Sequence, residues 1–181
     1  IFTSCLGNVE PSEKPKGDIS PLEEYTSPKE VYATGDTAED DFINLFSPDV
    51  LVEIEIDISN EQLALLQSDY EHYKSFGSKS PIYRMADLHV TLTNDQRTYT
   101  YIIKQVGVRM KGNTSRTSFY SDSDGMYNLI HFKVSFQETF DEVEYYGNSV
   151  LKWSDDTLRK ARKNRTFATL EKIDMRWNRN D

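Results

Sequence analysis

The 181-residue sequence is short of several kinds of residue, and each shortage excludes a class of protein. It contains a single cysteine, Cys5, so no disulfide can form within the chain. No uninterrupted apolar run approaches the roughly 18 residues that a transmembrane helix requires. Basic residues are outnumbered by acidic residues, 21 to 30, and the formal net charge is −9. Nucleic-acid binding is therefore not expected, because it needs a broad basic surface. Any anion site must be a local basic patch.

Cys5 ends the sequence IFTSC, in which small residues precede a cysteine, as at the end of a lipoprotein signal. The polar, proline-containing stretch LGNVEPSEKPKGD that follows is typical of a tether. We interpret Cys5 as the lipidated first residue of a cell-surface or secreted bacterial protein that contacts the membrane only through this anchor. The alternative is a free cysteine in a tail. Since there is no initiator Met and almost no hydrophobic signal segment, we expect the sequence to start partway through a longer chain.

Residues 1–46 are rich in Glu, Asp, Pro, Ser and Thr, and their apolar residues follow neither the helical nor the strand period. This composition predicts a largely disordered tether. Residues 43–46 (INLF) are expected to dock where the domain begins, so the folded domain is predicted over residues 47–181.

From residue 50 the hydrophobic pattern becomes regular. The stretch VLVEIEIDI (50–58) alternates strictly between apolar and other residues, which predicts a half-buried strand. Its polar face carries Glu53, Glu55 and Asp57. We expect these carboxylates to be solvated and to discourage pairing along the strand edge.

A helix and a hairpin are predicted next along the chain. Ser59 and Gln62 form a capping box that opens a helix running to about Lys74. Residues 85–93 and 97–112 alternate again on either side of the polar turn TNDQ. Two such strands joined by a short turn predict an antiparallel hairpin.

The last third of the chain adds two strands and a helix to this pattern. Residues 128–136 (NLIHFKVSF) alternate, and residues 169–181 are predicted to form a further strand. Residues 154–165 have an acidic start and a basic end, which suits the dipole of a short helix. We expect its basic run RKARKNR (159–165) to be a solvated helix end, or alternatively a dock for an acidic peptide or a phosphate. The fold class is therefore predicted as α+β, a mostly antiparallel sheet of about five strands with one or two packed helices.

The stretch VGVRMKGNTS (106–115) carries the candidate site. If its strand pairs with the strand through residue 133, the apolar faces of the two strands coincide, and so do their polar faces. The shared polar face then gathers four basic side chains: Arg109, Lys111, His131 and Lys133. Gly107 lies among them, and its missing side chain is expected to permit a ligand to approach closely.

The end of this strand supplies groups suited to an anion. Gly112 and Asn113 can adopt turn geometries that aim backbone N–H groups at an anion, and Thr114 and Ser115 would add hydroxyl donors. A nucleotide triphosphate would be held there by the lysine charges and the amides. The alternative is that this face is simply the solvated side of a half-exposed sheet.

Five segments, taken in order, resemble the first half of the CotH family of atypical protein kinases, found in spore coats and in bacterial surface and secreted proteins. They are IDISNEQLALL, ADLHVTL, VGVRMKGNTSR, HFKVSF and TLEKIDMRWNRND, and together they span roughly residues 50–181. VGVRMKGNTS resembles the family feature VGxRxKGNSS, with Thr114 where serine is commoner. HFKVSF resembles the family strand KPFKIKF, with Ile130 and Ser135 where lysines are frequent.

The resemblance implies the N-terminal lobe of a kinase-like fold that uses ATP with Mg²⁺ or Mn²⁺. The phosphate would go to Ser or Thr of an extracytoplasmic or spore-coat protein. Lys133 matches the lysine that contacts the ATP phosphates, with Lys111 as the alternative, and Arg109 and the Gly112–Ser115 turn would lie beside them. The family's catalytic and metal-binding aspartates are expected after Asp181, so this chain is not expected to phosphorylate a substrate by itself. The rival hypothesis is a non-catalytic surface module that binds a protein or a glycan, using exposed tyrosines and the 112–127 loop.

Overall fold

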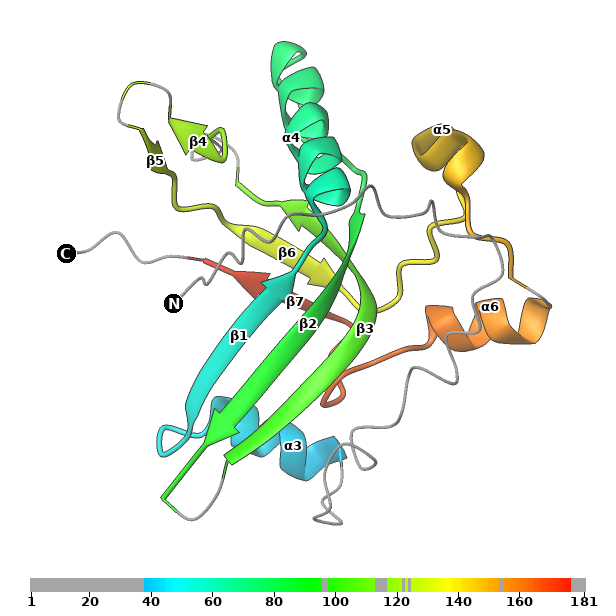
Figure 1. Cartoon of the computed structure of the whole chain (residues 1–181). Helices are drawn as coiled ribbons and strands as arrows, with labels where there is room; N and C mark the ends of the chain where they lie inside the picture. Colours follow the sequence, from blue (N-terminus) through cyan, green and yellow to red (C-terminus); the bar gives the residue numbers. More distant parts are fainter. Residues whose placement is uncertain are drawn as a thin grey trace.

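The computed structural model describes residues 38–95, 98–112, 117–121, 123, 125–153 and 155–176 (Figure 1). The predicted α+β class is confirmed, because five antiparallel strands form one curled sheet with helices around it. The strands of this sheet are β1 (Leu51–Asp57), β2 (Arg84–Thr93), β3 (Thr98–Met110), β6 (Phe132–Ser135) and β7 (Lys172–Met175). They lie in the order β1-β2-β3-β6-β7.

The helices are short apart from the one that follows the first strand. They are α3 (Ala38–Phe46), α4 (Asn60–Ser75), α5 (Val143–Tyr146) and α6 (Asp156–Lys163), with a 3₁₀ turn at Gly147–Ser149. The predicted start of the long helix is confirmed, since the Ser59 hydroxyl accepts a hydrogen bond from the Gln62 N–H at 3.2 Å. Leu66 and Tyr70 of α4 are buried, so this helix packs its apolar stripe on the domain.

The core lies on the concave face of the sheet. The alternation predicted for β1 is confirmed, since Val52, Ile54 and Ile56 are half-buried and the acidic residues between them are exposed. The fully covered members of the core come mainly from β2, β3 and β6: Leu88, Val90, Val106, Val108, Val134 and Phe136. The edge strands β1 and β7 contribute half-buried residues to the same face, so the sheet curls until both edges line one pocket.

A β-bulge between β2 and β3 keeps the core face continuous. The register shifts between Ala86 and Leu88, and Gln105 on β3 has a φ of 53°. Ile103 and Val106 are both buried although they are three positions apart and would face opposite sides of a regular strand, because the extra residue turns Val106 back toward the core. The residues that follow, from Gly107 to Lys111, inherit their orientation from this bulge.

Two segments have more structure than the sequence predicted. Residues 38–46, assigned to the tether, form helix α3, and its Leu45 is 8% exposed and belongs to the core. Leu45 anchors this helix to the sheet. The loop predicted over 112–127 contains a small hairpin, β4 (Tyr120–Ser121) and β5 (Met126–Tyr127), that pairs Tyr120 with Tyr127.

Gly107→Ala is expected to destabilise the fold. A Cβ atom at this position would lie 2.7 Å from Cβ of Glu138 and 2.9 Å from Cβ of Tyr83, and atoms so close to the backbone cannot swing aside. The expected loss is about 1–3 kcal/mol of unfolding free energy, as for other overpacked sites. Urea unfolding followed by circular dichroism measures it. An unchanged midpoint would show that the contact is not tight.

Candidate phosphate-binding site

The basic residues predicted to share a face do so, because of the register of three strands. Arg109 on β3 lies opposite Lys133 on β6, and Lys133 lies opposite Asp174 on β7. The neighbouring pairs Val108–Val134 and Met110–Phe132 follow the same register on the opposite face. The apolar faces of the two strands therefore coincide, as predicted.

Lys111 and Lys133 converge on one carboxylate. The Lys111 ammonium forms a hydrogen-bonded ion pair with Oδ2 of Asp174, and Nζ of Lys133 lies 3.9 Å from Oδ1 of the same residue. Both ammonium groups are thus on the same side of the sheet. The lysine side chains are 23% and 26% exposed, so a ligand from solvent can reach them. With Arg109 beside them, the cluster has more positive than negative charge.

Asp174 neutralises part of this charge. Partial burial works to raise the pKa of the Asp174 carboxyl, but the hydrogen bond and charge of Lys111, with the charges of Lys133 and Arg176, hold it below its ordinary value of 3.8. The carboxylate is therefore ionised at neutral pH. Any anion that binds here has to compete with it for the two lysines.

Arg109 is held in place by neighbouring protein groups. Its guanidinium donates a hydrogen bond to the Ser80 carbonyl at 3.0 Å and lies over the ring of Tyr83, 5.0 Å from the centroid. Burial raises the pKa of the Tyr83 hydroxyl, although the charge of Arg109 opposes this. The ring therefore stays neutral and acts as a platform that fixes the guanidinium.

The prediction that Gly107 lets a ligand approach is wrong. The space beside Gly107 is filled by Glu138 and Tyr83, whose Cβ atoms lie within 3 Å of where its own Cβ would be. The glycine permits close packing inside the protein, and the part of this face that remains open begins at Arg109 and Lys111. His131 contributes its carbonyl, which accepts a hydrogen bond from the Lys111 N–H at 2.7 Å.

The turn after the strand is described only at its first residue. Gly112 has a φ of 123°, a conformation that favours glycine, which agrees with the predicted turn. Asn113, Thr114 and Ser115 lie outside the described residues, as does the candidate lipidation residue Cys5.

The prediction that RKARKNR is a solvated helix end is confirmed for Lys160 and Lys163, which are exposed, and is wrong for two of its arginines. Arg162 is 1% exposed and Arg165 is 4% exposed. Nε of Arg162 donates to the Glu138 carbonyl at 2.6 Å, its guanidinium lies over the Phe140 ring, and Arg165 donates to the Lys104 carbonyl at 2.6 Å. These arginines fasten α6 to the sheet and to the segment after β6, and they are not available to a substrate.

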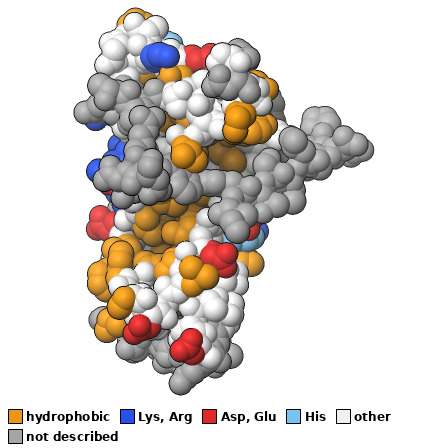
Figure 2. All heavy atoms as spheres, turned by 90° about the vertical axis from the view of Figure 1, so that its left-hand side faces the viewer, with side chains coloured by type: hydrophobic (Ala, Val, Ile, Leu, Met, Phe, Trp, Pro, Cys, Tyr) orange, Lys and Arg blue, Asp and Glu red, His pale blue; other side chains and the backbone are white. Residues whose placement is uncertain are grey.

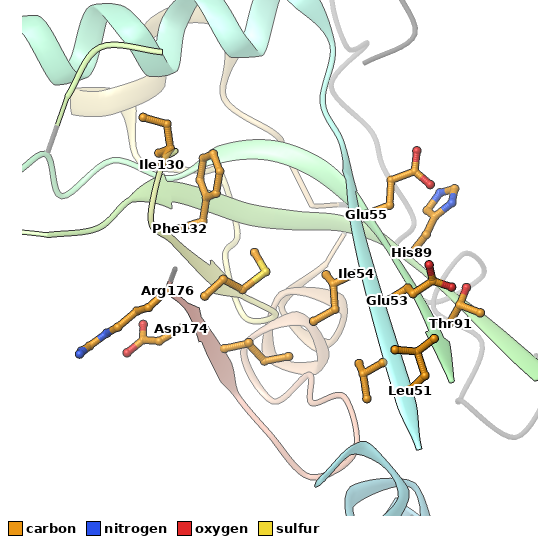
Figure 3. Close-up of a pocket in the computed structure, with 13 residues that line it drawn as sticks. Leu51, Glu53, Ile54, Glu55, His89, Thr91, Ile130, Phe132, Asp174 and Arg176 are labelled. Atoms are coloured by element: carbon orange, nitrogen blue, oxygen red, sulfur yellow. The ribbon is translucent and has the colours of Figure 1, made fainter. Parts of the chain in front are cut away.

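A separate apolar trough lies between β1 and the β6–β7 pair. It encloses about 930 Å³ and is lined by Val52 and Ile54 from β1, Ile130 and Phe132 at β6, and Ile173 and Met175 from β7. Figure 3 shows Ile54, Ile130 and Phe132 in the space between these strands, while Asp174 and Arg176, which also border the trough, extend their side chains away from it. The trough and the basic cluster therefore occupy opposite faces of β7.

A membrane-spanning helix and a metal-binding cluster are both absent from the part of the chain that the structure describes. It contains no helix long and apolar enough to cross a membrane. In the same residues, no group of three or more His, Cys, Asp or Glu side chains gathers as a metal site would require.

Comparisons of the chain with protein-family models, with curated proteins and with solved structures find no match.

Replacing Lys111 by Met is expected to raise the pKa of the Asp174 carboxyl toward 3.8, because the closest positive charge is removed. Because the pKa of the Asp174 carboxyl is lower in the folded protein than in the unfolded chain, its ion pair stabilises the fold at any pH above the unfolded pKa. This stabilisation is lost as the pH falls through the folded pKa. A carboxyl ¹³C NMR titration between about pH 2 and 6 measures the change. Lys152→Met is the control, since Lys152 is exposed and distant in sequence from the cluster. Equal Asp174 titrations in both variants would contradict the ion pair.

Proposed function

We propose that this chain is the nucleotide-binding portion of a CotH-like atypical protein kinase, and that Arg109, Lys111 and Lys133 bind the phosphates of ATP. The observation that carries the proposal is the convergence of Lys111 and Lys133 beside Arg109 on one accessible face, in a chain whose net charge is −9. A local excess of positive charge on an acidic protein needs a reason, and an anionic ligand supplies one.

The three cations suit different parts of a polyphosphate. Lysine ammonium groups act as point charges that follow oxygen atoms of varied position, and both point to one spot near Asp174. Arg109 is fixed on Tyr83, and its planar guanidinium has five N–H donors, one of which reaches the Ser80 carbonyl. Gly112 leads into Asn113, Thr114 and Ser115, whose amides and hydroxyls would complete the phosphate contacts.

The remaining parts of the proposal rest on the resemblance to the CotH family. ATP would bind with Mg²⁺ or Mn²⁺, whose charge offsets that of the phosphates and of Asp174. The phosphate acceptor would be Ser or Thr of an extracytoplasmic or spore-coat protein. The location, outside the cytoplasm and anchored to the membrane, rests on Cys5 as a lipidation site.

The test is nucleotide binding by the full chain and two opposed variants. Lys133→Met is expected to weaken binding of Mg-ATP about tenfold, the value of one charge-assisted hydrogen bond. Asp174→Asn is expected to tighten it, because the lysines lose their competing carboxylate. Isothermal titration calorimetry measures both, and saturating nucleotide at about 100 times its dissociation constant should stabilise the wild type by roughly 2.7 kcal/mol.

The two variants control for each other, because both alter partly exposed side chains of the same ion-pair cluster and change its net charge in opposite directions. Failure of Mg-ATP to bind or stabilise the wild type would refute the proposal. So would equal affinities in all three proteins, which would place the nucleotide elsewhere.

A second candidate function, binding of a protein or glycan ligand, is favoured by the β4–β5 hairpin. Tyr120 and Tyr127 stack edge to face with centroids 5.5 Å apart, and they are 44% and 68% exposed. Gln67 of α4 accepts a hydrogen bond from the Phe119 N–H at 3.1 Å and donates one to Ser118. The hairpin is thus fixed to α4 and presents an exposed aromatic pair, a common feature of binding surfaces.

If this second function holds, Tyr127→Ala should abolish retention of the full chain on an array of polysaccharides or cell-wall proteins. The ring makes no core contact, so the melting temperature should stay within about 2 °C of the wild type. Phe76→Ala, which removes another exposed aromatic ring, is the control and should bind normally. Retention that survives Tyr127→Ala would exclude the hairpin as the binding surface.

A further inference from the structure

Strand β1 is at the edge of the sheet that the described residues form, and we call its unpaired side the free edge. Among the described residues it pairs with β2 alone, through seven residue pairs from Leu51–Thr93 to Asp57–Asp87. In the part of the chain that the structure describes, no strand pairs with the backbone N–H and C=O groups on its other side. An edge of this kind can accept another strand, and seven residues at about 3.3 Å each give an edge roughly 23 Å long.

The apolar trough extends over this free edge. Besides the apolar residues that face the core, its lining includes Glu53, Glu55 and His89 from the opposite face of the sheet. Figure 3 shows these polar side chains on one side of β1 and Ile54 on the other. In Figure 2, which faces this side of the molecule, hydrophobic side chains gather around the middle of the surface. A strand laid along β1 would therefore contact both faces at once, as a sheet neighbour does.

The two faces require different side chains from such a strand. The trough offers apolar contact with Ile54, Phe132 and Ile173. The outer face offers the carboxylates Glu53, Glu55 and Asp57, all exposed, and none of them has an ion-pair partner in the described part of the chain. Cross-strand neighbours of opposite charge stabilise a sheet, and like charges destabilise it.

We propose that the free edge of β1 binds an extended, basic segment of another protein as an added strand. In this segment apolar residues alternate with Lys or Arg. The apolar side chains enter the trough between β1 and β7, the cations face Glu53 and Glu55, and the backbones pair. This inference concerns a different surface from the phosphate cluster and does not depend on nucleotide binding.

Charge favours a basic strand over two other occupants of this edge, a second copy of the chain and residues 1–37. A second copy pairing through β1 would bring the same three carboxylates face to face, which the sheet disfavours. Residues 1–37 carry seven acidic and three basic side chains, so they too are a poor match for the acidic edge. The same carboxylates that disfavour pairing between two copies would form ion pairs with the Lys or Arg side chains of a basic strand.

The test uses the full chain and a fluorescent seven-residue probe, acetyl-Lys-Val-Lys-Val-Arg-Val-Lys-amide, followed by fluorescence anisotropy. Binding is expected to weaken as salt rises, since the contacts on the outer face are ionic. The double variant Glu53→Gln, Glu55→Gln should weaken binding about fivefold and flatten the salt dependence. The matched control Glu142→Gln, Glu144→Gln removes the same charge from two exposed residues near α5 and should bind like the wild type.

Two altered probes separate strand addition from simple charge attraction. A probe with Glu in place of Lys and Arg should not bind. A probe N-methylated at every internal residue keeps its charges but cannot pair its backbone, and should bind at least about tenfold more weakly.

Several results would overturn the proposal. One is no binding of the basic probe up to about 1 mM, as expected if the chain's own residues fill the trough. Others are equal binding of the N-methylated probe, or equal loss of binding in the Glu142, Glu144 control. A dimer in sedimentation velocity that the Glu53, Glu55 variant strengthens would assign the edge to a second copy instead.

Discussion

The Asp87 carboxylate stabilises the β-bulge at Gln105 of β3, and the orientation of the side chains after the bulge depends on it. It accepts a hydrogen bond from the Gln105 N–H at 2.8 Å and forms an ion pair with Lys104 at 2.9 Å. Both partners lie in the bulge of β3, where Gln105 has a left-handed φ that costs energy for a residue with a side chain. Because of this extra residue, Val106 and Val108 face the core and Arg109 and Lys111 face outward. Without the bulge, the same stretch would point its cations into the core.

At the border of the apolar core, buried polar side chains hold the helices to the sheet. Arg84, 8% exposed, donates two hydrogen bonds to Asp69 of α4, at 2.7 and 2.8 Å, in a bidentate ion pair. Arg162 of α6 is buried against the Glu138 carbonyl and the Phe140 ring. Burial also raises the pKa of the Glu138 carboxyl, even though hydrogen bonds from Phe140 and Tyr146 lower it. Charge-assisted hydrogen bonds have a defined geometry, so the Arg84–Asp69 pair orients α4 and the bond from Arg162 to the Glu138 carbonyl orients α6 relative to the sheet.

The same arrangement keeps the two proposed binding surfaces apart. Successive residues of a strand face opposite sides, so β7 presents Asp174 to the basic cluster while Ile173 and Met175 line the trough. A phosphate ligand would approach the outer face of β6 and β7, and a strand would approach the edge of β1. The curled sheet therefore has a charged surface and an apolar surface, and a ligand on one does not cover the other.

The alternation of residues in the sequence was enough to predict most strands, the Ser59 cap, and the shared face of Arg109, Lys111 and Lys133, because these depend on local periodicity and on a single strand pairing. The apolar alternation of β3 shifts by one residue between Ile103 and Val106, and this shift is visible in the sequence. By itself it did not predict a β-bulge. Helix α3 was missed because its stability comes from Leu45 reaching the core. Docking of residues 43–46 was expected from their apolar character, but the helix that carries them was not.

Other features were decided only by the tertiary structure, because they join residues far apart in the chain. Asp174 meets Lys111 across 63 positions, and nothing near either residue signals the contact. Gly107 looked like an opening for a ligand until Glu138 and Tyr83 were seen to fill the space beside it. Arg162 and Arg165 looked solvated, since charge predicts exposure, but carbonyl groups at the sheet and an aromatic ring cover them. The sequence by itself determined which side chains each strand presents on each face. The curling of the sheet and the packing of α6 decided which of those side chains remain open to a ligand.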